Sequence, residues 1–216
     1  MTINLAPDSH PPIALSGDEV ALLAIARRAA EDSPDRSRKV GAVIVDAQGE
    51  IVSVGCNTLP DGVEHSDEFL SRPAKYDWTE HAERNAIFEV AKSLGKSTDG
   101  CTMVLPWFPC AHCARAIVQA GIQRVVAPYP DVTDPNWGEE FKTALRMLEK
   151  NKVAFDHFID DRPPPRPRAE GDHAESLSAD GRAPISAWVD HWNVRRAVLD
   201  ESTWQPVSTR RPGMRR

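Results

Sequence analysis

The sequence predicts an α/β fold: a three-layer αβα sandwich in which a mixed five-stranded sheet carries helices on both faces. Apolar runs of strand length alternate with helical patterns along residues 16–160. Only a short turn at Gln48 and Gly49 separates the first two runs, which indicates an antiparallel hairpin. Helix-length segments separate the later runs, which indicates right-handed crossovers between parallel strands.

The first elements have clear boundary signals. Ser16 and Glu19 have the spacing of a capping box, and apolar residues then recur at helical intervals, so we expect a helix over residues 17–32. Residues 40–46 form a continuous apolar run, typical of a strand covered on both faces. Residues 51–56 complete the hairpin.

The segment 59–79 is polar and irregular, and we expect a long loop there. Such a loop inside a compact domain usually has a functional reason. After it, helices and strands alternate to the end of the predicted domain. The expected helices are residues 80–96, 110–121 and 137–150, and the expected strands are residues 102–105, 124–127 and 153–158.

Composition divides the 216 residues into four parts. We expect a flexible arm over 1–15, a folded domain over 16–160, a Pro- and Arg-rich linker over 161–184, and a short amphipathic helix with a basic tail over 185–216. The tail helix should occupy residues 185–199, where tryptophans and aliphatic residues fall at helical spacing.

The charge and the apolar pattern exclude several classes of function. The formal net charge is -6, which argues against broad capture of a nucleic-acid backbone, although residues 162–216 hold ten arginines. The sequence has no apolar run long enough to span a membrane and no secretory signal at its start. Four cysteines do not make a disulfide framework in a chain of this size. We therefore expect a cytoplasmic protein with no membrane partner.

Two short motifs carry the chemistry. His81 and Glu83 stand two residues apart, and Cys110 and Cys113 follow a proline with two residues between the thiols. Both motifs fall at predicted helix starts, where the helix dipole lowers thiol pKa values. Three protein ligands, His81, Cys110 and Cys113, leave a Zn²⁺ ion one open position for water. Glu83 is then free to shuttle a proton, and these parts fit hydrolytic deamination of an aminated heteroaromatic ring.

A purely structural zinc site is the alternative for this cluster. Such a site needs a fourth protein ligand and leaves Glu83 without a task. Cys56 and Cys101 are expected as small buried apolar residues rather than ligands. His112 should point to another side of its helix, and His65 is a candidate substrate contact in the long loop.

The chain resembles the cytidine and deoxycytidylate deaminase superfamily, most closely the deoxycytidylate (dCMP) deaminases. The similarity covers about Ser33 to Phe158. The matching segments are Val40–Val45, Gly55–Gly62, Lys75-Tyr76, His81–Ile87, Phe108–Ala114 and Ala120–Ile122. The resemblance implies a cytidine deaminase-like fold, zinc on the two cysteines and the histidine, and a catalytic Glu83. It also implies a dimer or hexamer and a loop 59–79 that helps to close over a nucleotide.

The substrate contacts are expected from five residues. They are Asn57, which the resemblance places on the sugar, Ala82, Val43, Trp107 and Tyr129, the candidate for stacking on a base.

The sequence departs from the family pattern at two positions. Thr58 replaces a usual glycine, and Asp61 stands at a variable position that is often basic, where a carboxylate beside a phosphate pocket would repel a 5′-monophosphate. The candidates for contacts to the phosphate are Arg36, Arg38, Lys39 or Lys75.

The reaction predicted first is the conversion of dCMP to dUMP and ammonia. The same chemistry on a free base, a nucleoside, an s-triazine or a guanine-type ring remains an alternative. So do a deaminase that acts on nucleic acid and a zinc-binding module without catalysis.

Overall fold

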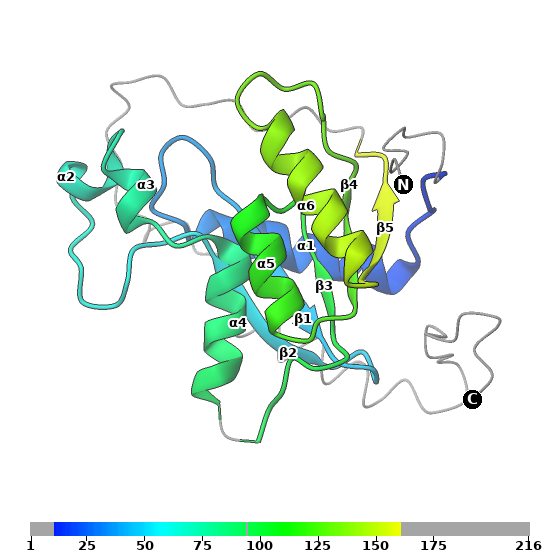
Figure 1. Cartoon of the computed structure of the whole chain (residues 1–216). Helices are drawn as coiled ribbons and strands as arrows, with labels where there is room; N and C mark the ends of the chain where they lie inside the picture. The colour runs from blue at the N-terminus through cyan, green and yellow to red at the C-terminus, as the bar shows by residue number, and fades with distance from the viewer. Residues whose placement is uncertain (1–10, 94, 161–216) are drawn as a thin grey trace, which may run out of the picture.

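The computed structural model describes residues 11–93 and 95–160, which form a mixed five-stranded sheet with helices on both faces. The strand order is β2-β1-β3-β4-β5. β1 pairs antiparallel with β2 and β3, whereas β3, β4 and β5 run parallel. Figure 1 shows α1 behind the sheet and α4, α5 and α6 in front of it. The α/β sandwich predicted from the sequence is confirmed.

The elements have the following bounds. The strands are β1 Gly41–Val45, β2 Ile51–Cys56, β3 Thr102–Val104, β4 Arg124–Pro128 and β5 Ala154–Phe158. The helices are α1 Gly17–Glu31, α2 Asp67–Leu70, α3 Lys75–Trp78, α4 Ala82–Lys92, α5 Ala111–Gln119 and α6 Gly138–Lys150.

The apolar run of β1 is explained by two separate cores. Ala42 and Ile44 face the core built with α4, α5 and α6. Val43 and Val45 face the opposite core, which is built with α1. Because neighbouring side chains on a strand point to opposite faces, a strand between two helical layers must be apolar at every position.

Helix α4 lies directly on β2. A Cβ added at Gly55 would stand 2.6 Å from the backbone nitrogen of Ala86 and 2.7 Å from the carbonyl oxygen of Ala82. The Ser53 hydroxyl donates a hydrogen bond of 2.7 Å to the Ala86 carbonyl. Only glycine permits this close approach. The contact fixes the position of α4, the helix that begins after His81.

The predicted loop 59–79 differs from the structure, because it contains the short helices α2 and α3. The two helices stand to the left of the sheet in Figure 1 and pack through Phe69 and Trp78, whose ring centroids are 4.5 Å apart. Periodicity over four residues is too short to signal a helix.

The predicted boundaries shift in two other places. Helix α4 begins at Ala82 rather than residue 80 and ends at Lys92. At the other end of the chain, Ile13 donates a backbone hydrogen bond to His157 and Leu15 packs on the α1 core. Residues 1–10 of the expected arm lie outside the described residues.

The linker over 161–184 and the tail over 185–216 lie outside the described residues. Among the residues that are described, no helix has both the length and the apolar character that crossing a membrane requires.

Candidate zinc centre and substrate pocket

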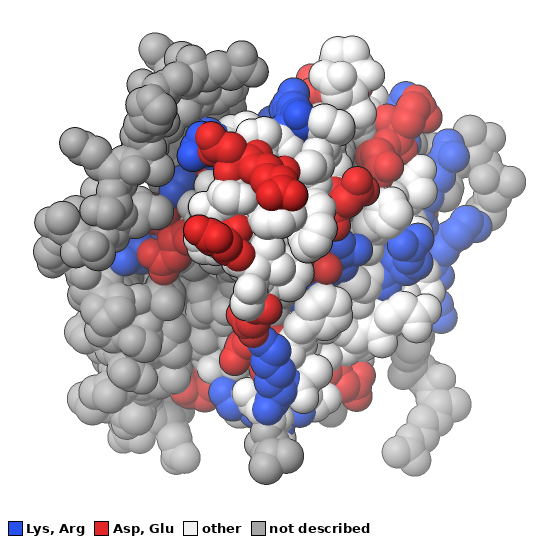
Figure 2. All heavy atoms as spheres, turned by 90° about the vertical axis from the view of Figure 1, so that its left-hand side faces the viewer, with Lys and Arg blue, Asp and Glu red and all other residues white. Residues whose placement is uncertain are grey.

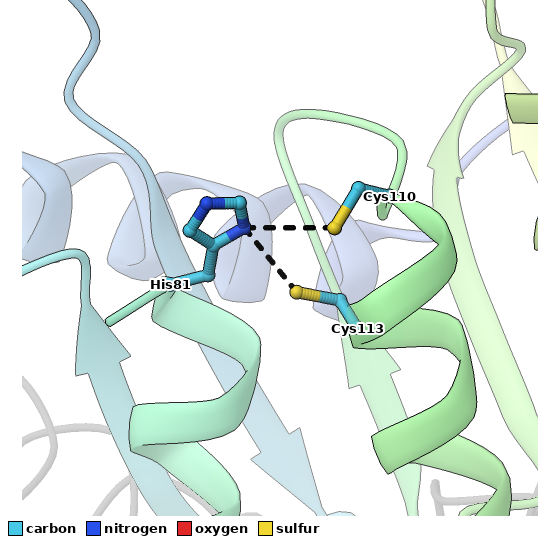
Figure 3. A group of neighbouring side chains, drawn as sticks. All are labelled: His81, Cys110 and Cys113. Carbon is cyan, nitrogen blue, oxygen red and sulfur yellow. Dashed lines mark hydrogen bonds between the residues drawn. The ribbon is translucent and has the colours of Figure 1, made fainter. Parts of the chain in front are cut away.

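Two helix starts bring the motif residues together. His81 is the N-cap of α4 and Cys110 is the N-cap of α5, both with extended backbone, and Cys113 lies in the first turn of α5. Figure 3 shows the imidazole and the two thiols pointing toward one another across the gap between these helices. The carboxylate of Glu140 on α6 accepts a 3.2 Å hydrogen bond from the backbone N–H of Ala111 and so braces the start of α5.

The ligand atoms have the spacing of a tetrahedral zinc site. Nδ1 of His81 lies 3.7 Å from Sγ of Cys110 and 3.4 Å from Sγ of Cys113, and all three atoms lie within 4.8 Å of one another. Ordinary zinc bond lengths in a tetrahedron separate nitrogen and sulfur ligands by about 3.5 Å. The residues therefore fit a Zn²⁺ ion without rearrangement.

The electrostatics of the site favour an anionic sulfur. The pKa of the Cys110 thiol is lowered to about 3, chiefly by a hydrogen bond from the Cys113 thiol and also by His81, against the opposing effect of burial. A thiolate is the form that binds zinc.

Glu83 is the titratable group beside these ligands. Its side chain is buried, and burial raises the pKa of its carboxyl above the usual value, although the charge of His81 opposes this rise. Glu83, His81 and Cys110 line the same pocket. A buried carboxyl with a raised pKa is suited to accept a proton and pass it on.

The pocket extends from this centre to the segment that carries α3. Its aromatic wall is formed by Trp107, Phe108, Trp137 and Phe141. Its other lining residues are Asp35, Ser37, Arg38, Val40, Asn57, Arg72, Lys75, Tyr76, Thr79 and Ala82, together with the site residues His81, Glu83 and Cys110.

Three of the five expected substrate contacts line this pocket: Asn57, Ala82 and Trp107. Val43 does not, because its position on β1 turns it to the α1 core on the opposite face of the sheet. Tyr129 does not line it either. Its ring packs at 5.0 Å from His157 and 6.2 Å from Phe155, at the edge of the sheet.

Sequence reasoning missed the contribution of α6 and of the segment before α3. Trp137 and Phe141 complete the aromatic wall of the pocket. Arg72, which precedes α3, and Thr79, which follows it, line the same pocket. Trp137, directly before a predicted helix, was a visible signal, because a large aromatic residue at a helix start has to pack against something. Arg72 gave no such signal.

The basic residues named from the sequence have different partners. Arg36 pairs with Asp67 at 2.7 Å, Lys39 donates to the Glu31 carbonyl, and Lys75 pairs with Asp35. Arg38 lines the pocket, with its guanidinium carbon 4.3 Å from the centroid of the Trp107 ring.

Asp61 does not act on the pocket as expected. Its side chain is 96% exposed, pairs with Lys92 at 3.2 Å, and is absent from the pocket wall. The repulsion expected from this carboxylate is therefore a wrong prediction: the turn at 60–63 carries it out to solvent beside α4.

Comparison with known proteins agrees with this site. The family described as the cytidine and deoxycytidylate deaminase zinc-binding region matches residues 17–128. The chain belongs to this family. It is therefore a hydrolytic deaminase, and its cofactor is zinc, which the His/Cys/Cys group is able to bind.

Curated relatives share the same domain. The deoxycytidylate deaminase of Mus musculus is 37% identical over 136 residues, which cover 59% of this chain and 71% of that protein. The deoxycytidylate deaminase of Homo sapiens is 36% identical over 148 residues, covering 63% and 77% respectively. The match extends well beyond the two zinc motifs.

Solved structures share the fold. The dCMP deaminase from cyanophage S-TIM5 in its apo form superposes with a TM-score of 0.53 at 26% identity, covering 67% of this chain and all of that one. The same enzyme solved in complex with dCMP and dUMP gives a TM-score of 0.53 at 25% identity.

Proposed function

We propose that this deaminase converts dCMP to dUMP and ammonia. The observation that carries the proposal is a single pocket that joins the zinc ligands and Glu83 to two guanidinium groups, Arg38 and Arg72. Relatives named deoxycytidylate deaminase, and a structural neighbour solved with dCMP and dUMP, support this substrate.

The reacting end of the pocket supplies proton transfer. His81, Cys110 and Cys113 would hold the Zn²⁺ ion, which would lower the pKa of water and so supply a nucleophile at neutral pH. Glu83 accepts the proton that the water loses and delivers it to the ring nitrogen. It then takes the proton of the hydroxyl group newly bound to the ring carbon and gives it to the departing amine as the carbon–nitrogen bond breaks. Hydrolysis places the oxygen of water on the ring carbon and releases the amino group as ammonia, so the reaction consumes no other reagent. The burial of Glu83 keeps bulk water from competing for that proton.

The distal end of the pocket can bind a 5′-phosphate. Among the described residues, neither Arg38 nor Arg72 forms an ion pair with a carboxylate. Guanidinium groups bind phosphate through paired N–H donors, and two of them can neutralise its charge. Asp61 is directed to solvent. Among the described residues, the carboxylates that line this pocket are Asp35, which pairs with Lys75, and Glu83, which lies at the zinc end.

The aromatic wall suits a planar base. The rings of Phe108 and Phe141 hold each other edge to face at 5.8 Å, and Trp107 is stacked by Arg38. Aromatic rings at such a wall offer a flat apolar surface to a pyrimidine.

The surface favours a small substrate over a nucleic acid. Figure 2 shows the side of the molecule that carries α2 and α3, and on the residues described there basic and acidic side chains are interspersed. A nucleic-acid groove needs a continuous basic track.

We also propose that the enzyme forms a homo-oligomer, and light scattering in solution would test this.

Ammonia release from zinc-loaded protein tests the substrate. We expect turnover of dCMP well above that of deoxycytidine, cytosine or guanine. Higher activity on deoxycytidine or guanine would refute a nucleotide substrate.

The variant Glu83→Gln tests the chemistry. It should keep its zinc, measured by metal analysis, while kcat falls by about 10²–10⁴-fold. Unchanged activity in a zinc-loaded E83Q protein would exclude Glu83 as the proton carrier.

A further inference from the structure

A cluster of four polar side chains, Asp35, Ser37, Asn57 and Lys75, lines the distal end of the pocket. We call it the Asp35 cluster. The Lys75 ammonium lies 2.7 Å and 3.0 Å from the two carboxylate oxygens of Asp35 and also contacts the Ser37 hydroxyl. The two charged side chains are only 11% and 6% exposed. An ion pair this buried holds its partners firmly, because separating them would leave an unpaired charge.

The cluster joins two segments that are distant in the sequence. Asp35 belongs to the loop between α1 and β1, whereas Lys75 is the first residue of α3. Asp35 also accepts hydrogen bonds from the backbone N–H groups of Ser37, at 2.7 Å, and Arg38, at 3.2 Å. The carboxylate therefore shapes the turn that presents Arg38 and ties that turn to α3.

Asn57 fixes the same turn from β2. Its side-chain oxygen accepts from the Val40 N–H at 2.7 Å, and its amide group donates to the Arg38 carbonyl at 2.9 Å. A further, longer contact of 3.4 Å runs to Asp35. With these partners the amide holds the backbone on both sides of Lys39.

Lys75 lines the pocket, but its hydrogen-bonding capacity is used. An ammonium group has three donors, and the Asp35 oxygens and the Ser37 hydroxyl provide three acceptors. Arg38 on the loop and Arg72, three residues before Lys75, remain without a carboxylate partner among the described residues and reach the same pocket. The ion pair of Lys75 with Asp35 thus links the loop that carries Arg38 to the segment that carries Arg72.

We propose that Asp35 and Lys75 form a positioning pair that sets the separation of Arg38 and Arg72, and so makes the enzyme selective for a nucleotide 5′-phosphate over the free nucleoside. In this role the pair acts through the placement of the two arginines, and neither of its members is itself the phosphate ligand. This inference rests on the proposed function, since it explains how the chain selects a phosphorylated substrate.

A double-mutant cycle of Asp35→Asn, Lys75→Met and D35N/K75M tests the pair, with kcat and KM measured on dCMP and on deoxycytidine. Each single variant should raise the KM for dCMP about tenfold, the size expected for one weakened charge-assisted hydrogen bond, and leave the deoxycytidine kinetics and the zinc content unchanged. The double variant should be no worse than either single one, because both changes break the same contact. It also leaves no unpaired buried charge, so it tests the proposal even if a single variant does not fold.

The exposed pair of Arg36 and Asp67 provides a matched control. It links the same loop to α2 at 2.7 Å, with side chains 45% and 71% exposed, and it lies outside the pocket. Arg36→Met should leave every constant unchanged.

Three results would overturn the positioning pair. If K75M weakens dCMP while D35N strengthens it, Lys75 is itself a phosphate ligand. If both variants lower kcat on dCMP and deoxycytidine alike, the pair only maintains the fold. If neither variant changes the KM for dCMP, the pair has no part in selection.

The wild-type protein separates this failure from that of the proposed function. Without a preference for dCMP over deoxycytidine in the unmodified enzyme, the proposed function fails. With that preference intact and the variants unaffected, only the positioning pair fails.

Discussion

The contact between β2 and α4 predicts that Gly55→Ala will damage catalysis from a site that substrate never reaches. The new Cβ would stand 2.6 Å from the backbone nitrogen of Ala86. Ordinary contacts of a Cβ begin at 3.4 Å, so α4 has to move by about 0.8 Å relative to β2. The atoms that the new Cβ would meet belong to the backbone of α4, so no side chain can rotate away to relieve the contact.

The size of both effects follows from this displacement. Overpacking of a closed core costs about 1–3 kcal/mol of unfolding free energy, or about 2–12 °C in Tm for a domain of this size. Because His81 caps α4 and Glu83 lies in its first turn, the same movement shifts the proton carrier relative to Cys110 and Cys113. A misplacement of about 1 Å in a catalytic group can cost about 10²-fold in rate.

Thermal unfolding and dCMP turnover, measured on zinc-loaded protein, check this prediction. Gly17→Ala is the matched control, because nothing lies within 4 Å of a Cβ at Gly17 in the first turn of α1. That change should leave kcat unaltered and raise the unfolding free energy slightly, by about 0.4–1 kcal/mol. If G55A behaved like G17A, the close contact would not constrain the site and the reasoning would fail.

The remaining predictions concern zinc, acid stability and packing. Cys113→Ser should release zinc to a chelator far faster than the wild-type protein, measured with a colorimetric indicator, since a hydroxyl is a poor substitute for a thiolate. Burial alone would raise the pKa of Asp35, but hydrogen bonds from Lys75 and Ser37 lower it below 3.8. The stability that this ionised carboxylate contributes is present above pH 3.8 and is lost as the pH falls through the lowered pKa. The variant D35N should therefore flatten the acid limb of a plot of unfolding free energy against pH. Ile117→Ala, at a fully buried position of α5, should lower the unfolding free energy by about 2–5 kcal/mol in urea titrations.

The sheet and the zinc ligands were predictable from the sequence because their signals are local. Each signal predicts one local structure from a few consecutive residues, whether it is a hairpin turn, a continuous apolar run or a helix-start motif. Cys110 and Cys113 lie on one helix turn because only two residues separate them. His81 then has only to lie close to that turn.

The substrate end was harder to predict because it depends on which segments meet. Val43 and its neighbours look alike in sequence, and only the direction of each side chain on β1 decides which core it enters. Asp61 was judged by its place in a motif, whereas its real partner is Lys92 on α4. Arg72 lies in a segment whose short helices have no periodic signal.

The two ends of the pocket differ in how they are supported. The bond-breaking end stands on α4 and α5, both seated on the same face of the sheet, whereas the end that we assign to the phosphate is built from the connection between α1 and β1 and from the segment around α3. Connections tolerate substitution and insertion far better than packed helices do. Mutational drift in those two connections can therefore redirect such an enzyme to a new metabolite while its hydrolytic machinery stays untouched.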